Sequence, residues 1–172
     1  VDAAALAGAK VRDYLVGGAS QQVINGNIPP NKLDFLQKAD GNNIVNKNDP
    51  VDYFQFTHTF YQDNSISSSC FNLLNPILNK IKCLSLLNIK ANLLTKTNTN
   101  VEHGLHCDYD NDKITTGILY INTNNGYTKF KDGNVEISEK NKYVEFQSKL
   151  LHTGASCTDK NIRIVLNFNY IK

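Results

Sequence analysis

The segment GLHCDYD holds the side chains best suited to chemistry, because it places His106 and Asp108 two positions apart. In an extended strand, residues i and i+2 point to the same side, so this pair shares one face while Cys107 takes the other. An imidazole nitrogen and a carboxylate oxygen on one face can bind the same divalent metal ion. A firm site needs a third ligand, and His152 in KLLHTGAS is the candidate. Two histidines and one carboxylate leave the other positions of the ion open, as in non-haem Fe(II) oxygen chemistry.

A His-x-Asp pair alone is a weak signal, because a chain with four histidines contains one by chance about one time in five. Independent support comes from Arg163, which lies in the strand-like segment NIRIVLNFNYIK on the same face as Val165 and Asn167. A guanidinium is costly to bury unless it meets an anion, and its planar fork matches a carboxylate. That carboxylate is either an internal Asp or Glu or part of a bound ligand, and the pattern leaves both interpretations open.

The elements that must position these side chains are mostly short strands. A dense run of aromatic and β-branched residues at 51–61 predicts a first strand. Turn sequences such as TNTN, NTNNG and KDG separate the later strands, which we expect at 88–95, 104–108, 114–122, 127–131, 134–138, 142–147 and 161–170. Many short strands with frequent turns are typical of an all-β sandwich or barrel.

Helices are expected mainly in the N-terminal half. Apolar residues at helical spacing predict a helix over 67–83 that packs on a sheet, with Pro76 either early in this helix or at the start of a second one. A short helix is also expected over 31–38, with Asn31 as its cap. We therefore predict a mainly β (α+β) fold, a jelly-roll core supported by N-terminal helices. The 172 residues fit a single domain, with strands and support helices in 1–85 and the core with its metal site in 86–172.

Composition excludes several classes of protein. A hydrophobic fraction of 41% supports a packed core, and a net charge of +2 gives no basic face for nucleic acid or an anionic membrane. No apolar run approaches the roughly 20 residues of a membrane helix, and no secretory signal is evident at the start of the sequence. The four cysteines lack C-x-x-C spacing, so we expect reduced thiols in a cytoplasmic protein. The oligomeric state is left open.

From about Asn92 to Tyr170 the chain resembles the prolyl-4-hydroxylase-like branch of the 2-oxoglutarate/Fe(II) oxygenase family. The matching segments are HCD (106–108), TTGILYIN (115–122), NGYTKF (125–130), DG (132–133), LLHTG (150–154) and RIVLNFNY (163–170). The resemblance implies a double-stranded β-helix with iron ligands at His106, Asp108 and His152. It also implies that Arg163 binds the distal carboxylate of 2-oxoglutarate.

The same resemblance implies an activity. Fe(II), O₂ and 2-oxoglutarate as co-substrate would hydroxylate an unactivated C–H bond with release of succinate and CO₂, and ascorbate would serve as reductant. Related halogenases replace the metal-binding carboxylate with a small residue, so Asp108 favours hydroxylation. The branch implies a prolyl residue of a peptide or protein as the substrate, and free proline or another small molecule is the alternative.

The chain departs from the family pattern around the pocket. Tyr127 stands where the family often has a second glycine, and Val165 where it often has a hydroxylated residue. The position of a family tyrosine that contacts the co-substrate corresponds to Leu119, with Tyr120 on the opposite face. Tyr120, Tyr127 and Thr128, with Leu119 and Val165, are therefore the further candidates for the pocket.

Two other histidines are assigned no metal-binding role. His103 is three positions before His106, so in an extended segment it would face away from it, in a loop or behind the ligands. His58 lies in an aromatic-rich strand and is predicted to be structural.

Two other functions compete with the oxygenase. The first is a cupin-type enzyme that uses Mn, Ni or Zn without 2-oxoglutarate, in which Arg163 would have no role. The second is a non-catalytic β-sandwich, such as a sugar-binding or virion-structural module, with an exposed His152.

Overall fold

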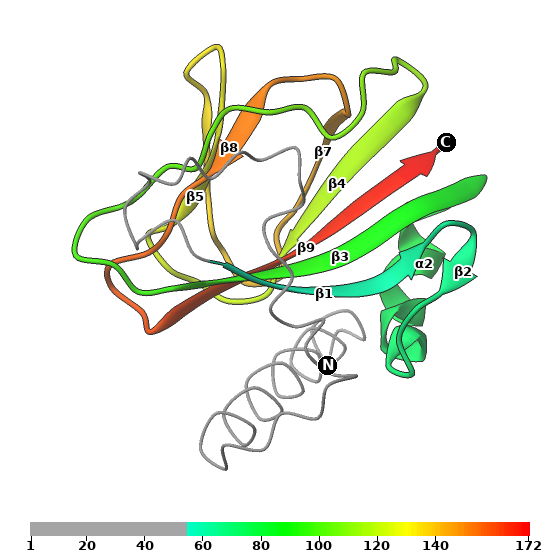
Figure 1. The fold of residues 1–172 in the computed structure, drawn as a ribbon, viewed down its shortest axis with the longest axis horizontal. Helices are drawn as coiled ribbons and strands as arrows, with labels where there is room; N and C mark the ends of the chain where they lie inside the picture. Colours follow the sequence, from blue (N-terminus) through cyan, green and yellow to red (C-terminus); the bar gives the residue numbers. More distant parts are fainter. Residues whose placement is uncertain (1–54) are drawn as a thin grey trace.

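The computed structural model describes residues 55–172, and the predicted helix at 31–38 lies outside this range. Figure 1 shows the order of its elements. They are β1 (Gln55–Gln62), β2 (Ser65–Ile66), the 3-10 helix η3 (Phe71–Leu74), α2 (Asn75–Ile81), β3 (Ser85–Thr95), β4 (Ile114–Tyr120), β5 (Tyr127–Phe130), β6 (Val135–Ile137), β7 (Tyr143–Gln147), β8 (His152–Gly154) and β9 (Ile162–Ile171).

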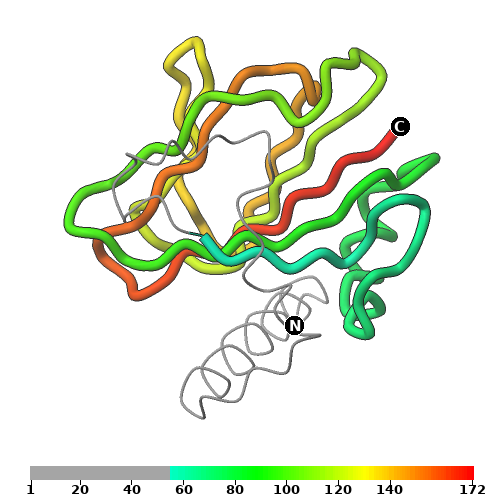
Figure 2. The backbone as a smooth tube through the Cα atoms, viewed as in Figure 1, coloured from blue at the N-terminus to red at the C-terminus, as the bar shows by residue number. Residues whose placement is uncertain are grey.

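The strands form two antiparallel sheets that stand across from each other (Figures 1 and 2). The larger sheet has six strands in the order β2-β1-β3-β9-β4-β7, and the smaller has three in the order β6-β5-β8. Strands that are far apart in sequence are neighbours in this sheet, since β9 lies between β3 and β4. The mainly β, jelly-roll prediction is confirmed. β1, expected in the N-terminal support region, is itself a strand of the large sheet.

The two faces of the large sheet have different chemistry. On β9, Ile164, Leu166 and Phe168 point away from the smaller sheet and into the main apolar core. Ile77 and Ile81 of α2 pack against them from outside the sheet. The alternate residues, which begin with Arg163 and Val165, point toward the smaller sheet and line a cavity. The predicted alternation along this strand is confirmed. It gives the protein an apolar outer face that stabilises the fold and an inner face that is free to carry polar groups.

The helical segment is shorter than predicted. Instead of one helix over 67–83, a 3-10 turn at Phe71–Leu74 precedes α2 at Asn75–Ile81. Pro76 stands in the first turn of α2, where its missing N–H costs no hydrogen bond, so the α-helix begins there. Lys82, with φ of 51°, is a left-handed cap that ends it.

Most predicted strands are found within a few residues of their expected bounds, but the one at 104–108 is wrong. That segment pairs with the chain near β8 only through isolated bridges, Glu102 with Ala155 and His106 with His152. The two bridges are four residues apart on one segment, from Glu102 to His106, but only three apart on the other, from His152 to Ala155. The pairing therefore shifts by one residue, and no regular ladder forms. β8 itself was not predicted. Within residues 55–172 no helix is long and apolar enough to cross a membrane.

Candidate metal centre

Backbone pairing brings the two candidate histidines together although 46 residues separate them in sequence. The main-chain N–H of each of His106 and His152 donates to the carbonyl of the other, at N···O distances of 3.0 and 2.9 Å. The Asp108 N–H donates to the carbonyl of Ser148 at 3.1 Å, which continues the alignment. The segment that precedes β4 is therefore fastened to the segment that enters β8.

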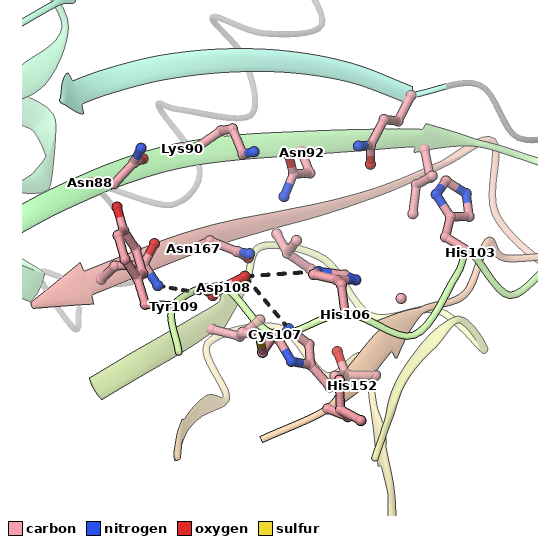
Figure 3. A pocket seen from close by; sticks show the side chains of 18 of the residues that line it. Asn88, Lys90, Asn92, His103, His106, Cys107, Asp108, Tyr109, His152 and Asn167 are labelled. Atoms are coloured by element: carbon pink, nitrogen blue, oxygen red, sulfur yellow. Dashed lines mark hydrogen bonds and ion pairs between the residues drawn. The ribbon is translucent and has the colours of Figure 1, made fainter. Parts of the chain in front are cut away.

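The three side chains converge on one point (Figure 3). Asp108 Oδ1 is 3.8 Å from His106 Nε2 and 3.9 Å from His152 Nε2. One ligand atom from each residue lies within 4.8 Å of the others. Since bonds from a divalent ion to nitrogen and oxygen are about 2.0–2.2 Å, modest side-chain movements suffice for all three to bind one ion. The arrangement matches the two-histidine, one-carboxylate set of non-haem iron sites.

Hydrogen bonds fix both imidazoles in the tautomer that a metal requires. The Nδ1 atoms of His106 and His152 are each 3.0 Å from a backbone carbonyl, of Gly104 and Leu150 respectively. A carbonyl oxygen only accepts, so Nδ1 carries the proton and Nε2 presents a lone pair. The two Nε2 atoms are those that face Asp108, so the donor set fits a cation.

Asp108 is held so that one carboxylate oxygen is left for a metal. Its Oδ2 accepts hydrogen bonds from Thr116 Oγ1 at 2.8 Å and from Asn169 Nδ2 at 2.9 Å. Thr116 and Asn169 are paired on β4 and β9, so the sheet itself orients this carboxylate. Oδ1, the oxygen nearest both imidazoles, is the one that remains for binding.

His152 is the most enclosed of the three ligands, with 3% of its side chain exposed. The rings of Phe146 and Phe130 pack against it, with centroid distances of 4.8 and 6.3 Å. Burial lowers its pKa from the usual range, an effect that the nearby Asp108 carboxylate partly opposes. The imidazole is therefore neutral at pH 7, which is the form that binds metals.

Arg163 is almost fully buried, with 2% exposure, yet it forms no salt bridge with any residue of the described range. Its Nε donates to Ser138 Oγ at 2.8 Å, and Nη2 donates to Thr128 Oγ1 at 3.3 Å. The guanidinium carbon lies 5.7 Å from the centre of the Tyr120 ring. Burial lowers the pKa of Arg163 to about 10, so it stays protonated at pH 7. Of the two interpretations left open by the sequence, the internal salt bridge is thus not found between residues 55 and 172.

One cavity of about 530 Å³ contains both features. Its walls include the three candidate ligands and Arg163, together with polar side chains from β3 and β9. Figure 3 shows Asn88, Lys90 and Asn92 projecting from β3 above Asp108 and His106. An anion bound to Arg163 and a metal bound by the triad would therefore share a single cavity.

The further pocket candidates divide into two groups. Thr128 and Val165 line the cavity. Tyr120 is buried behind it and donates to Thr128 Oγ1 at 2.8 Å, which orients the group that Arg163 contacts. Tyr127 is not among the lining residues, and its hydroxyl donates to Glu102. The placement of Leu119 in the pocket is corrected: it pairs with Leu166 on the outer face and belongs to the main core.

Sequence reasoning missed the polar side chains that surround the ligands. Asn88, Lys90 and Asn92 alternate with apolar residues along β3, so the same period-two pattern that selected Arg163 would have found them. His103 lies outside the ligand cluster and lines the cavity, where burial and Arg163 lower its pKa. His58 is on the outer face, with Nε2 2.9 Å from Ser68 Oγ.

Comparison with known proteins gives a shared fold. No protein-family model matches the chain, and no curated protein matches it. An oxidoreductase of the 2OG-Fe(II) oxygenase family from Burkholderia pseudomallei aligns with a TM-score of 0.50 and 12% identity over 68% of this chain and 66% of that one. The non-haem α-ketoglutarate-dependent epimerase SnoN from nogalamycin biosynthesis aligns with a TM-score of 0.53 and 12% identity over 69% of this chain and 61% of that one.

A cupin-like protein from Thermotoga maritima aligns less well, with a TM-score of 0.43 and 9% identity over 67% of this chain and 68% of that one. The two oxygenase alignments agree with the jelly-roll architecture described above. At such identities the likeness concerns the fold, and this chain has a fold that 2-oxoglutarate oxygenases also have.

Proposed function

We propose that this protein is an Fe(II)- and 2-oxoglutarate-dependent dioxygenase that hydroxylates an unactivated C–H bond. One observation carries the proposal: a two-histidine, one-carboxylate cluster shares a cavity with a buried arginine that has no carboxylate partner among residues 55–172. Iron, with O₂ and 2-oxoglutarate, would supply the oxidising chemistry, in which the substrate gains one oxygen atom and 2-oxoglutarate leaves as succinate and CO₂.

His106, Asp108 and His152 would hold the iron on one side and leave the other side open. Thr116 and Asn169 keep the Asp108 carboxylate turned so that Oδ1 faces both imidazoles. Phe146 and Phe130 exclude water from the His152 side of the site. The chain thus contributes orientation and a partly dry environment, which are the roles expected of a protein around such an ion.

Arg163 would anchor the distal carboxylate of 2-oxoglutarate. Two of its five N–H donors are used by Ser138 and Thr128, which fix the plane of the guanidinium. The remaining donors can form charge-assisted hydrogen bonds to an anion. Because Arg163 is shielded from water, that attraction is strengthened, so a dicarboxylate is preferred over a neutral ligand.

The direct experiment measures succinate formation from 2-oxoglutarate with Fe(II), with ascorbate included to keep the iron reduced. Wild-type protein should form succinate only when Fe(II) is present, and H152A should form none. Fe(II) should also raise the melting temperature of the wild type but not of H152A. A metal-dependent thermal shift without succinate would favour a cupin-type metalloprotein, and neither signal would favour a non-catalytic module.

For the substrate, we propose a prolyl residue of a peptide or protein. The proposal is supported by the resemblance of the segments around His106, His152 and Arg163 to the prolyl-4-hydroxylase-like branch. Coupled succinate release should rise with proline-containing peptides and less with free proline. Mass spectrometry of the peptide should show a gain of one oxygen atom, and a gain on free proline alone would contradict this choice.

A further inference from the structure

The cavity holds two carboxamides for which the proposed iron and co-substrate provide no role. They belong to Asn92 on β3 and Asn167 on β9. Their Oδ1 atoms are buried and have no hydrogen-bond partner, and neither side chain bonds to any residue between 55 and 172. Buried polar groups in folded proteins are nearly always paired. Two unpaired carbonyl oxygens in the same cavity therefore indicate that a bound ligand donates hydrogen bonds to them.

Strand register places these two side chains side by side. Asn92 is paired with Val165, and Asn167 is paired with Lys90, so the two asparagines are diagonal neighbours on one face of the sheet. Such neighbours lie roughly 7–8 Å apart between Cα atoms. Figure 3 shows Asn92 and Asn167 on the side of the cavity where Asp108 and His106 lie. A ligand held by both would rest beside the candidate metal centre.

The pair is distinct from the anion anchor. Asn167 is four residues after Arg163 on the same strand, so their Cα atoms are roughly 14 Å apart at about 3.4 Å per residue. The carboxylate and keto oxygens of ionised 2-oxoglutarate only accept hydrogen bonds, so a co-substrate anchored at Arg163 cannot pair the unpartnered Oδ1 of Asn167. The group that meets Asn167 therefore belongs to another molecule, the substrate.

We propose that Asn92 and Asn167 bind neutral amide groups of the substrate and thereby set which molecules enter. Each carboxamide offers an N–H donor beside a carbonyl acceptor, and another amide presents the matching pair. A carboxylate would leave the buried Oδ1 atoms unpaired, and an ammonium group has no acceptor for the carboxamide N–H. The inference rests on the proposed function only in taking the bound molecule to be the one that is oxidised.

Two sources of amide fit this chemistry, a peptide main chain and a small-molecule amide. In an extended peptide, alternate residues are roughly 6.8 Å apart, close to the spacing of the two asparagines. A peptide laid across β3 and β9 could thus present one amide group to each. A small molecule with one or two amides would use the same hydrogen bonds without the additional length.

The test is a binding titration of the full chain without iron or 2-oxoglutarate, followed by NMR or calorimetry. The probe is N-acetyl-L-alanine N-methylamide, a neutral diamide in which each amide carries an N–H, and free L-alanine is the comparison. Wild-type protein should bind the diamide more tightly than free alanine. N92L and N167L should each raise its Kd about five- to tenfold, as expected for the loss of one buried hydrogen bond.

Controls separate this role from a general effect on folding. N79L makes the same chemical change at an exposed residue of α2 and should leave the Kd unchanged. N167D keeps the side-chain shape but adds a charge and removes a donor, so it should also weaken binding. A capped pentapeptide with central proline should bind more tightly than the diamide if the source is a peptide, and equally if it is a small amide.

An undetectable diamide interaction, or equal Kd values for wild type, N92L and N167L, would overturn the inference. Because the titration needs neither iron nor co-substrate, its result is independent of the succinate assay. Diamide binding without succinate formation would refute the proposed reaction but leave the amide site standing, and succinate formation without diamide binding would do the reverse.

Discussion

At the candidate metal centre, each ligand residue is held by a second group that leaves one atom free to bind. Backbone carbonyls accept hydrogen bonds from Nδ1–H of His106 and His152. Two side chains of the large sheet donate hydrogen bonds to Asp108 Oδ2. The free atoms are the ones that face one another. Groups behind metal ligands commonly change metal affinity 10- to 100-fold when removed. Metal affinity can therefore be lowered by substitutions at residues that do not themselves bind the metal.

Thr116 offers the cleanest test of that orientation. T116V keeps the shape of the side chain but removes the hydroxyl that donates to Asp108, so Co(II) or Fe(II) affinity should fall about tenfold. T116S retains the hydroxyl and should recover most of the affinity. Metal titration followed by absorbance or calorimetry measures both. Equal affinity in T116V and wild type would show that Asn169 alone orients the carboxylate.

Arg163 should contribute to binding and not to folding. A buried guanidinium without an acidic partner within residues 55–172 has lost water and gained two hydroxyl hydrogen bonds and one aromatic ring contact. R163M should therefore leave the free energy of unfolding within about 1 kcal/mol of wild type, while 2-oxoglutarate binding falls by about two orders of magnitude. Urea denaturation and calorimetry separate the two effects. A loss of about 3–5 kcal/mol in stability would instead indicate a structural ion pair.

At the scale of the elements, the smaller sheet is shaped around Arg163. β5 and β8 carry Thr128 and Gly154, which border the guanidinium, and Gly126 precedes β5 directly beneath its side chain. A Cβ at Gly126 would lie 2.5 Å from Arg163 Cδ, 2.8 Å from Asn124 Oδ1 and 3.0 Å from the Ala155 carbonyl. Glycine is needed here because backbone and arginine approach closely.

We expect G126A to displace Arg163 and to weaken co-substrate binding. Because the three close neighbours are two buried side chains and a backbone carbonyl, overpacking should also cost about 1–3 kcal/mol of stability. The KM for 2-oxoglutarate and urea denaturation report the two effects. G104A is the matched control for stability, since a Cβ there would meet nothing within 4 Å. If G126A and wild type shared the same KM, the position of Arg163 would not depend on this contact.

At the scale of the whole molecule, two packed regions have separate tasks. The outer face of the large sheet and α2 form the main apolar core, while a small cluster of Ile118, Tyr120 and Val165 lies between the sheets. The inner face is thereby free for the cavity, because most of the apolar burial that stabilises the fold takes place elsewhere. Changes in the cavity should therefore affect function more than stability.

Burial also makes the stability of the metal-free protein depend on pH. Desolvation lowers the pKa of His58, His103 and His152 below the ordinary value near 6.5. Well above pH 6.5 these histidines are neutral in both the folded and the unfolded protein. As the pH falls through it, the unfolded chain takes up protons that the folded chain resists, so the free energy of unfolding decreases.

Urea denaturation in EDTA should show lower stability at pH 5.5 than at pH 7.5, with a slope of at most about 1.4 kcal/mol per pH unit for each histidine. H58Q removes one such group on the outer face, away from the cavity, and should make the slope shallower. A flat profile over this range would contradict the assignment of these histidines as buried and neutral.

Local pattern determined much of this architecture. Runs of β-branched and aromatic residues predicted most strands, and period-two alternation predicted correctly that Arg163, Val165 and Asn167 share the inner face of β9. These features need only neighbours in sequence, because side-chain direction in a strand alternates with every residue. The helix at 67–83 was predicted too long because apolar periodicity does not report a 3-10 turn or a left-handed end at Lys82, whereas Pro76 correctly marked a second helical start.

Only the tertiary structure decided which distant groups meet. His106 faces His152 through an irregular, slipped pairing that a regular strand at 104–108 would not give, and Arg163 lies among hydroxyls instead of carboxylates. The register of β3 against β9 brings Asn92 beside Asn167. Such contacts depend on strand order, register and loop closure, which are settled by packing of the whole chain and leave no trace in the spacing of any one segment.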